Sequence, residues 1–306
     1  MLSFQNSYFE EEWREGFFVE SKMKHAWAAE LEVLDEIRRI CEKHGLQYFA
    51  TRGTLLGAIR HKGYIPWDDD VDIGMKRKDF QRFLEVAEKE LPSQWVLVHV
   101  RKNKEWDQPF ARLINGRKID YTKEHLEQFH GCPYVVGVDI FPFDNLPKDD
   151  DEAVVIYSLM KILYGAIVDL QHKRADEAEE KIKEIESLMK VEVDRRRNII
   201  NQLFCLIDQI SNMYTEEEAS QLVQWHVWAY WDVKRTYEKE WYNGMIWMPF
   251  ENTEVPVPVR YDEALRVMFG ENYMMPIRGK AGHDYPFYKE QDKAWEEEQE
   301  RRKGKS

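Results

Sequence analysis

The chain has 306 residues and carries 44 lysine and arginine residues against 57 aspartate and glutamate residues, which gives a formal net charge of -13. A chain of this length can bury a sizeable core, as one large domain or as a domain with a helical insertion. The negative charge argues against nucleic acid or an anionic membrane as the main partner. No apolar run reaches the length of a membrane span, and the N-terminus lacks the charged and apolar regions of a signal peptide.

The cysteines are few and far apart along the chain. Cys41, Cys132 and Cys205 are odd in number and widely spaced, so neither a disulfide framework nor a zinc knuckle is indicated. We therefore expect a reducing compartment, namely the cytoplasm, with the inner face of the membrane as a peripheral location.

The first half of the chain alternates helical and strand-like patterns. Apolar residues at helical spacing predict an amphipathic helix from about Ser21 to His44, which Gly45 ends. A strand over 46–51, a short helix over 54–60 and a helix over 80–91 follow, and the last of these stops at Pro92. Short strands are expected at 95–100, 110–114 and 135–141. This alternation indicates an α/β core.

The pattern changes from about residue 147. Residues 150–242 show long helical periodicity, and the strongly charged part at 173–190 is most simply a solvated helix face. Prolines within 245–260 indicate an edge strand or an extended segment. The tail after Lys289 is charged enough to fray or to remain disordered. We expect four parts: a catalytic core at 1–146, a helical region at 147–244, a segment completing the core at 245–289, and a charged tail at 290–306.

The most informative stretch, residues 53–73, contains a glycine turn, a cluster of cations and four aspartates. In an extended chain the carboxylates of Asp70 and Asp72 leave by the same face, while Val71 and Ile73 point into a core. Two such carboxylates repel each other, so something positive must hold them ionised. Mg²⁺, bound by one or two carboxylates together with substrate phosphates, suits this spacing. The turn at Gly53 precedes a short helix, whose N-terminal backbone N–H groups could receive an anion.

Two other interpretations of the acidic run were weighed. A solvated acidic loop is common, but Pro66, Trp67 and the β-branched residues bracket these acids with apolar side chains. A calcium loop would use Asp68, Asp70, Asp72 and Asp79 at positions 1, 3, 5 and 12 of an EF-hand. Ile73 then stands where such a loop needs glycine, which argues against it.

Taken together, residues Gly53 to Ile73 resemble the signature of the LicD family of phosphocholine transferases, which includes the catalytic domains of fukutin and fukutin-related protein. The family belongs to the nucleotidyltransferase-fold superfamily, whose pattern is a Gly-Ser/Thr turn, an Asp-x-Asp strand and a third acid on a later strand. Gly53-Thr54 and Asp70-Val71-Asp72 match the first two. The sequence at 138–144 resembles the later motif, which makes Asp139 the third carboxylate. The resemblance runs from the helix near Trp27 to about Pro276 and implies a mixed sheet with flanking helices and a large helical insertion.

The resemblance also implies a reaction. It predicts transfer of phosphocholine or a similar phospho-alcohol from a cytidine diphosphate alcohol, such as CDP-choline, to a sugar hydroxyl of a cell-surface glycan or teichoic acid precursor, releasing CMP. Mg²⁺ or Mn²⁺ would be held by Asp70, Asp72 and Asp139, with Asp68 as an additional ligand, and Asp139 would complete the metal site or accept a proton. The expected substrate contacts are Gly53, Thr54, Arg60, His61, Lys62 and Trp67. A nucleotidyltransferase acting on a nucleoside triphosphate, and a non-catalytic calcium- or glycan-binding protein, remain alternatives.

Two further features bear on the site. Many relatives carry an Arg-Asp pair after the strand near Phe110, whereas this chain has no such pair there. Arg112 and Arg117 are candidates for contacts to phosphate or acceptor, but they are most simply surface arginines. Aromatic residues crowd the second half of the chain. Trp225 and Trp228 are most simply helix core, but a choline-bearing substrate would require at least one aromatic ring at the active site, because aromatic faces attract quaternary ammonium groups.

Overall fold

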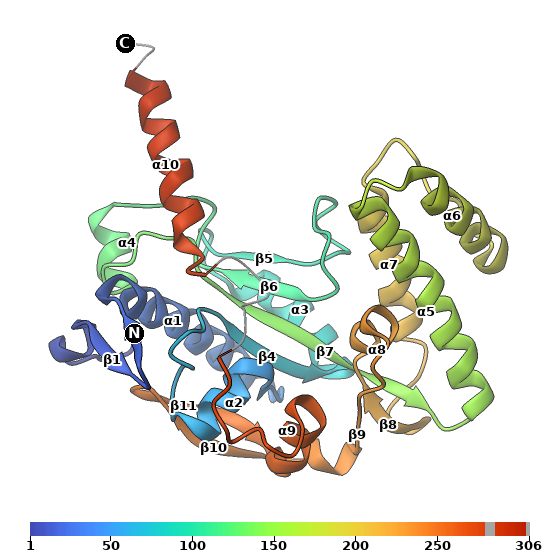
Figure 1. The fold of residues 1–306 in the computed structure, drawn as a ribbon, viewed down its shortest axis with the longest axis horizontal. Coiled ribbons are helices and arrows are strands. Elements are labelled where there is room, and N and C mark those ends of the chain that lie inside the picture. The colour runs from blue at the N-terminus through green and yellow to red at the C-terminus, as the bar shows by residue number, and fades with distance from the viewer. Residues whose placement is uncertain (279–284, 304–306) are drawn as a thin grey trace.

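The computed structural model describes residues 1–278 and 285–303. Within them, seven strands form the main sheet in the order β3-β4-β7-β6-β5, and β8 and β9 extend from the far half of β7 (Figure 1). The hairpins β1–β2 and β10–β11 form separate two-stranded sheets. The strands are β1 (Glu12–Arg14), β2 (Phe17–Val19), β3 (Phe49–Ala50), β4 (Val71–Lys76), β5 (Val96–Val98), β6 (Ala111–Ile114), β7 (Gly137–Pro147), β8 (Ala219–Val223), β9 (Thr236–Tyr237), β10 (Met245–Phe250) and β11 (Thr253–Pro258).

Helices cover this sheet and form a lobe beside it (Figure 1). The mixed α/β architecture predicted from the sequence is confirmed. The helices are α1 (Ser21–His44), α2 (Arg52–Arg60), α3 (Arg77–Glu90), α4 (Lys123–Gln128), α5 (Asp150–Gln171), α6 (Ala175–Met189), α7 (Ile199–Ser211), α8 (Trp225–Trp231), α9 (Tyr261–Phe269) and α10 (Tyr288–Lys303), with 3-10 turns η1 (Asn6–Phe9) and η2 (Lys239–Tyr242).

Helix α1 has the predicted bounds because its local signals agree with its tertiary packing. Its apolar stripe, including Trp27 and Ile37, is fully buried in the main core. Gly45 ends the helix in the left-handed conformation with φ of 63°, which glycine adopts without steric cost.

The long strand β7 joins the two parts of the molecule. Its first half pairs in parallel with β4 and antiparallel with β6, and its second half pairs antiparallel with β8. Its 11 residues extend well beyond the predicted strand at 135–141. Asp144 resembles a turn residue in the sequence, but Arg77 pairs with its buried carboxylate and the strand continues through it.

A second apolar core lies in the lobe formed by α5, α6, α7 and α8, with residues such as Met160, Leu163 and Leu203 at its centre. The region 147–244 is therefore mostly helical, as predicted. It also contains the strands β8 and β9, which the sequence analysis missed, because β8 is stabilised by pairing with the distant strand β7.

Helix α5 corrects the expectation that no apolar run reaches the length of a membrane span. An 18-residue window within Asp150–Gln171 has a mean hydropathy of 1.8, enough by length and composition to cross a membrane, and 44% of that window is buried inside the protein. A core helix passes the same test, and the buried side of α5 lines the second core.

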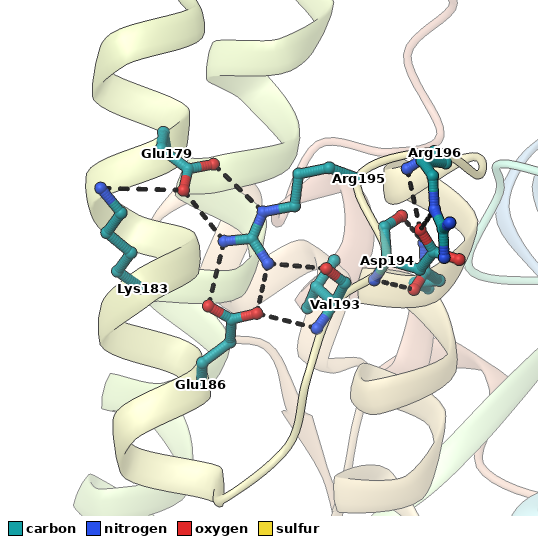
Figure 2. Close-up of polar contacts among 8 residues, drawn as sticks. Glu179, Lys183, Glu186, Val193, Asp194, Arg195 and Arg196 are labelled. Atoms are coloured by element: carbon teal, nitrogen blue, oxygen red, sulfur yellow. Dashed lines mark hydrogen bonds and ion pairs between the residues drawn. The ribbon is translucent and has the colours of Figure 1, made fainter.

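The charged helix α6 is more than a solvated face. Figure 2 shows Arg195, in the loop after α6, between Glu179 and Glu186, which lie two turns apart on that helix. Glu186 also accepts a hydrogen bond from the backbone N–H of Val193 at 2.8 Å. These contacts fasten the loop to the helix, so part of the predicted solvated surface is an ion-pair network.

The C-terminal part packs against the main core. Val255 and Val257 on β11 are buried in the main core. The expectation that the tail frays or is disordered is wrong for residues 290–303, which belong to α10, a helix that projects from the body (Figure 1). Its base is docked by Gln291, which bonds both backbone groups of Val135. Residues 279–284 and 304–306 lie outside the described residues.

Candidate active site

The candidate site is a row of side chains across the main sheet. Asp72 on β4 lies opposite Asp139 on β7, and Asp139 lies opposite Arg112 on β6. Because neighbouring strands are about 4.8 Å apart, register partners project from the same face as close neighbours. The sheet therefore presents two carboxylates and a guanidinium side by side.

Asp72 is fixed from behind by α2. Its backbone N–H donates to the Thr54 hydroxyl at 2.8 Å, and Thr54 is 3% exposed. The Asp72 side chain is itself buried. Burial, followed by the charges of Asp70 and Asp139, raises the pKa of Asp72 well above its ordinary value, while Arg52 opposes the shift. A nearby cation would relieve this repulsion.

Asp139 is engaged by Arg112. The Arg112 guanidinium donates to both carboxylate oxygens, with Nη2 at 2.7 Å from Oδ2. The Arg112 side chain is 42% exposed, as a surface arginine would be, but it also pairs with Asp139, because β6 and β7 pair in a register that places the two residues together. Arg117 is exposed, as predicted.

These residues open into one cavity of about 670 Å³, here named the aspartate cavity. Asp70, Asp72 and Asp139 lie on its sheet side, and aromatic rings from the strands and from the helical lobe make up much of the rest. The lining residues are Arg52, Asp70, Asp72, Trp106, Asp107, Gln108, Pro109, Phe110, Arg112, Asp139, Phe141, Tyr164, Ile167, Gln171, Phe204, His226, Tyr230 and Trp231.

The donor set fits a hard divalent cation, which prefers carboxylate oxygens. Asp70 directly precedes β4, Asp72 lies on β4 and Asp139 lies on the neighbouring strand β7. Asp72 is buried where its charge needs a partner. Among the described residues, however, no three His, Cys, Asp or Glu side chains already converge as a metal cluster. Arg112 holds both oxygens of Asp139.

Two further cavity residues were not foreseen. Arg52, at the start of α2, hydrogen-bonds through Nη2 to Nε2 of His226 on α8, and its guanidinium carbon lies 4.0 Å from the centroid of the Phe141 ring. Burial, and then the charges of Arg52 and Arg235, lower the pKa of His226 well below its ordinary value. Arg52 could have been suspected from the sequence, because it directly precedes the glycine turn. The sequence contains no feature that would place His226 at the site.

Asp68 and Gly53 lie together outside the lining of the aspartate cavity. A Cβ atom on Gly53 would collide with the Asp68 carboxylate, so glycine is needed for this close approach. The structure thus places an internal carboxylate near the start of α2, where the sequence suggested an external anion. Whether Asp68 binds metal and Gly53 contacts substrate stays a prediction, and Thr54 holds the backbone of Asp72.

The cations after α2 line a second cavity of about 420 Å³, separate in its lining residues from the aspartate cavity. Arg60 donates to the backbone carbonyl of Tyr273 at 2.9 Å, His61 contacts Glu15 at 3.1 Å, and Lys62 is exposed. Trp67 packs against the main core. The structure does not bring these four predicted substrate contacts to the acids, and their role in binding stays a prediction. The second cavity is lined by Arg14, Glu15, Arg60, His61, Lys62, Tyr64, Pro66 and Glu251.

The aromatic residues of the second half divide between core and cavity. Trp225 is buried and stacks on Trp228 with ring centroids 5.5 Å apart, which confirms the helix-core interpretation of this pair. Tyr230 and Trp231, at the end of the same helix, line the aspartate cavity and are 37% and 66% exposed. The cavity therefore has aromatic faces accessible to a ligand.

A mixed sheet that sets an Asp-x-Asp strand beside a strand with a third acid defines a nucleotidyltransferase-like transferase. Comparison with known proteins agrees, since residues 45–161 match the family described as LicD/FKTN/FKRP, nucleotidyltransferase domain. That range contains all four predicted metal ligands. Residues 45–161 thus match a LicD-type nucleotidyltransferase domain, and the protein is a LicD-like phosphotransferase.

Individual relatives extend this match beyond the family domain. The lipopolysaccharide cholinephosphotransferase LicD of Haemophilus influenzae is 27% identical over 264 residues, which cover 80% of this chain and 89% of that protein. Human ribitol 5-phosphate transferase FKRP is 48% identical over 40 residues, which cover 13% of this chain and 8% of FKRP. An uncharacterized protein of Rickettsia typhi is 33% identical over 81 residues, which cover 24% of this chain and 26% of that protein. The two named relatives transfer phospho-alcohol groups, as their names state.

Proposed function

We propose that this enzyme transfers phosphocholine, or a similar phospho-alcohol, from a cytidine diphosphate alcohol to a sugar hydroxyl of a cell-surface glycan or teichoic acid precursor, releasing CMP. The observation that carries this proposal is the composition of the aspartate cavity, which combines the carboxylates of Asp70, Asp72 and Asp139 with aromatic rings around them. Acids suit a metal-bound diphosphate, and aromatic faces suit a cationic alcohol.

In this reaction the acceptor oxygen attacks the phosphorus that bears the alcohol, and the bond from that phosphorus to the CMP oxygen breaks. Asp70, Asp72 and Asp139 would hold Mg²⁺ or Mn²⁺, and the ion would supply positive charge to the diphosphate. Asp139 completes that site or accepts the hydroxyl proton. Arg112 lies beside it as a further positive group facing the transferred phosphoryl.

The protein also positions the alcohol. The exposed rings of Tyr230 and Trp231 stand at the cavity, and each ring facing a quaternary ammonium contributes about 0.5–2 kcal/mol. A neutral alcohol of the same shape lacks that attraction. The preference of the enzyme for a cationic over a neutral alcohol should therefore depend on these rings.

Phosphorus NMR tests the proposal. The protein is incubated with Mg²⁺, cytidine diphosphate choline and a glycan acceptor, and CMP should accumulate together with a new phosphodiester. Pyrophosphate formed from CTP, with the choline donor intact, would instead identify a nucleotidyltransferase. A donor carrying the neutral 3,3-dimethylbutyl isostere of choline should react more slowly than cytidine diphosphate choline. In the Trp231→Ala variant the rates with the two donors should be closer to each other.

A further inference from the structure

The aspartate cavity contains more negative than positive charge, which is unsuitable for a diphosphate unless cations compensate. Its lining holds four aspartates and two arginines, Arg52 and Arg112. Arg112 is already paired with Asp139. Among the described residues, no carboxylate lies within ion-pair distance of Arg52. Its charge acts on the nearby Asp72 without a direct contact, so the guanidinium can still bind a ligand.

The surroundings of Arg52 orient its guanidinium without neutralising it. Its hydrogen bond goes to His226, and the Phe141 ring packs against it at 4.0 Å. His226 itself stacks on Phe141, with ring centroids 5.9 Å apart. The Nε atom of Arg52 is buried and has no hydrogen-bond partner. A cation held by two uncharged rings, with an unused donor, is suited to receive an anion.

The backbone conformation of Arg52 is strained, and glycine at this position would not be. Its φ is +49°, in the left-handed region, which costs a side-chain-bearing residue about 1 kcal/mol and which glycine occupies freely. Strained backbone conformations at a cavity point to a functional constraint. Here the strained residue is the one that brings an additional cation close to the acids.

We propose that Arg52 is an anion-binding residue of the aspartate cavity, whose guanidinium, held in place by His226 and Phe141, binds the diphosphate of the nucleotide donor. The identity of that donor rests on the proposed function. The anion subsite itself does not, because a guanidinium recognises any phosphate through the same charge-assisted hydrogen bonds.

The test uses Arg52→Gly, which removes the side chain and relieves the strained φ, so the melting temperature should equal or exceed that of the wild type. Arg52→Lys keeps the charge without the planar fork and serves if the glycine variant fails to fold. The matched control is Lys190→Gly, because Lys190 is an exposed cation with φ of +56° at the end of α6, outside the cavity.

Calorimetric titrations in excess Mg²⁺ compare inorganic pyrophosphate, cytidine diphosphate and cytidine. Arg52→Gly should weaken binding of both phosphate compounds by about tenfold or more and leave cytidine unchanged, since hydrogen bonds to charged groups are strong. Arg52→Lys should be intermediate, and Lys190→Gly should bind as the wild type does.

The outcomes separate the two proposals. Unchanged binding of pyrophosphate and cytidine diphosphate to Arg52→Gly would overturn the anion subsite, even if the enzyme releases CMP. Arg52-dependent binding of pyrophosphate without any binding of cytidine diphosphate would support the subsite and reject the proposed donor.

Discussion

Arg112 donates two hydrogen bonds to the carboxylate of Asp139, the residue directly across from it between β6 and β7. Asp139 is at the same time the register partner of Asp72 on its other side. One carboxylate thus stands between an acid that repels it and a base that attracts it. A bound cation and Arg112 would compete for the same carboxylate oxygens of Asp139. The affinity for the cation should therefore depend on Arg112.

That competition predicts opposite effects on metal binding and turnover. Arg112→Gln should tighten Mg²⁺ binding by about 3- to 10-fold, since Asp139 loses a competing cation, while turnover falls because a positive group facing the phosphoryl is lost. Isothermal titration calorimetry measures the Mg²⁺ affinity, and steady-state kinetics measure the turnover. Arg117→Gln, which alters an exposed arginine in the loop after β6, should change neither quantity. Weaker Mg²⁺ binding in Arg112→Gln would show that the arginine supports the metal site.

The Asp72 side chain should be needed for chemistry and dispensable for folding. Asp72→Asn removes a charged ligand and keeps the side-chain volume, so CMP release should fall by about 100-fold or more with little loss of melting temperature. Asp107→Asn, which alters an acid of the same cavity away from the sheet row, should retain most activity. Wild-type turnover in EDTA, or an active Asp72→Asn variant, would contradict a metal at these acids.

Thr54 should act through the backbone of Asp72. Thr54→Val keeps the shape but leaves the buried N–H of Asp72 without its acceptor, which should cost about 1–3 kcal/mol of unfolding free energy. Thr54→Ser retains the hydroxyl and should stay close to the wild type. Urea denaturation measures both. Equal stability of the two variants would mean that water or another group replaces the bond.

His226 should make the protein more sensitive to acid. Its pKa in the folded state lies below the ordinary value of 6.5, because burial and the neighbouring arginines disfavour the charged ring. Below pH 6.5 the unfolded chain therefore binds the proton more readily, so stability is present above that pH and is lost as pH falls. His226→Gln removes this group, and its melting temperature should fall less than that of the wild type between pH 7 and pH 5. An equal fall in melting temperature for both proteins between pH 7 and pH 5 would show that His226 does not cause the sensitivity to acid.

Local sequence was sufficient where one segment carries its own signals. The bounds of α1 follow from its apolar stripe and from Gly45, and the strand that carries Asp72 follows from the alternation of acids with β-branched residues. The alternation of helices and strands indicated the α/β class, and the family resemblance added the nucleotidyltransferase-like sheet and the third acid, Asp139. The cavity confirms that this acid faces the same space as the other two.

Other parts depend on pairings between distant segments. Arg112 looks like a surface residue until the register of β6 on β7 is known. His226 reaches the cavity only because β7 leads into the helical lobe that carries α8. Helix α10 has a highly charged sequence, and Gln291 near its start is hydrogen-bonded to Val135. A contact between such distant residues cannot be predicted from the local sequence.

The length of β7 has a consequence for how this enzyme can diversify. One continuous strand carries Asp139 in its first half and the attachment of the helical lobe in its second half. Substitutions on the lobe, at positions such as Tyr230, can reshape the far wall of the cavity while the hydrogen-bonded ladder keeps the acids in place. New alcohols or acceptors can thus be sampled on one side of a fixed reaction centre.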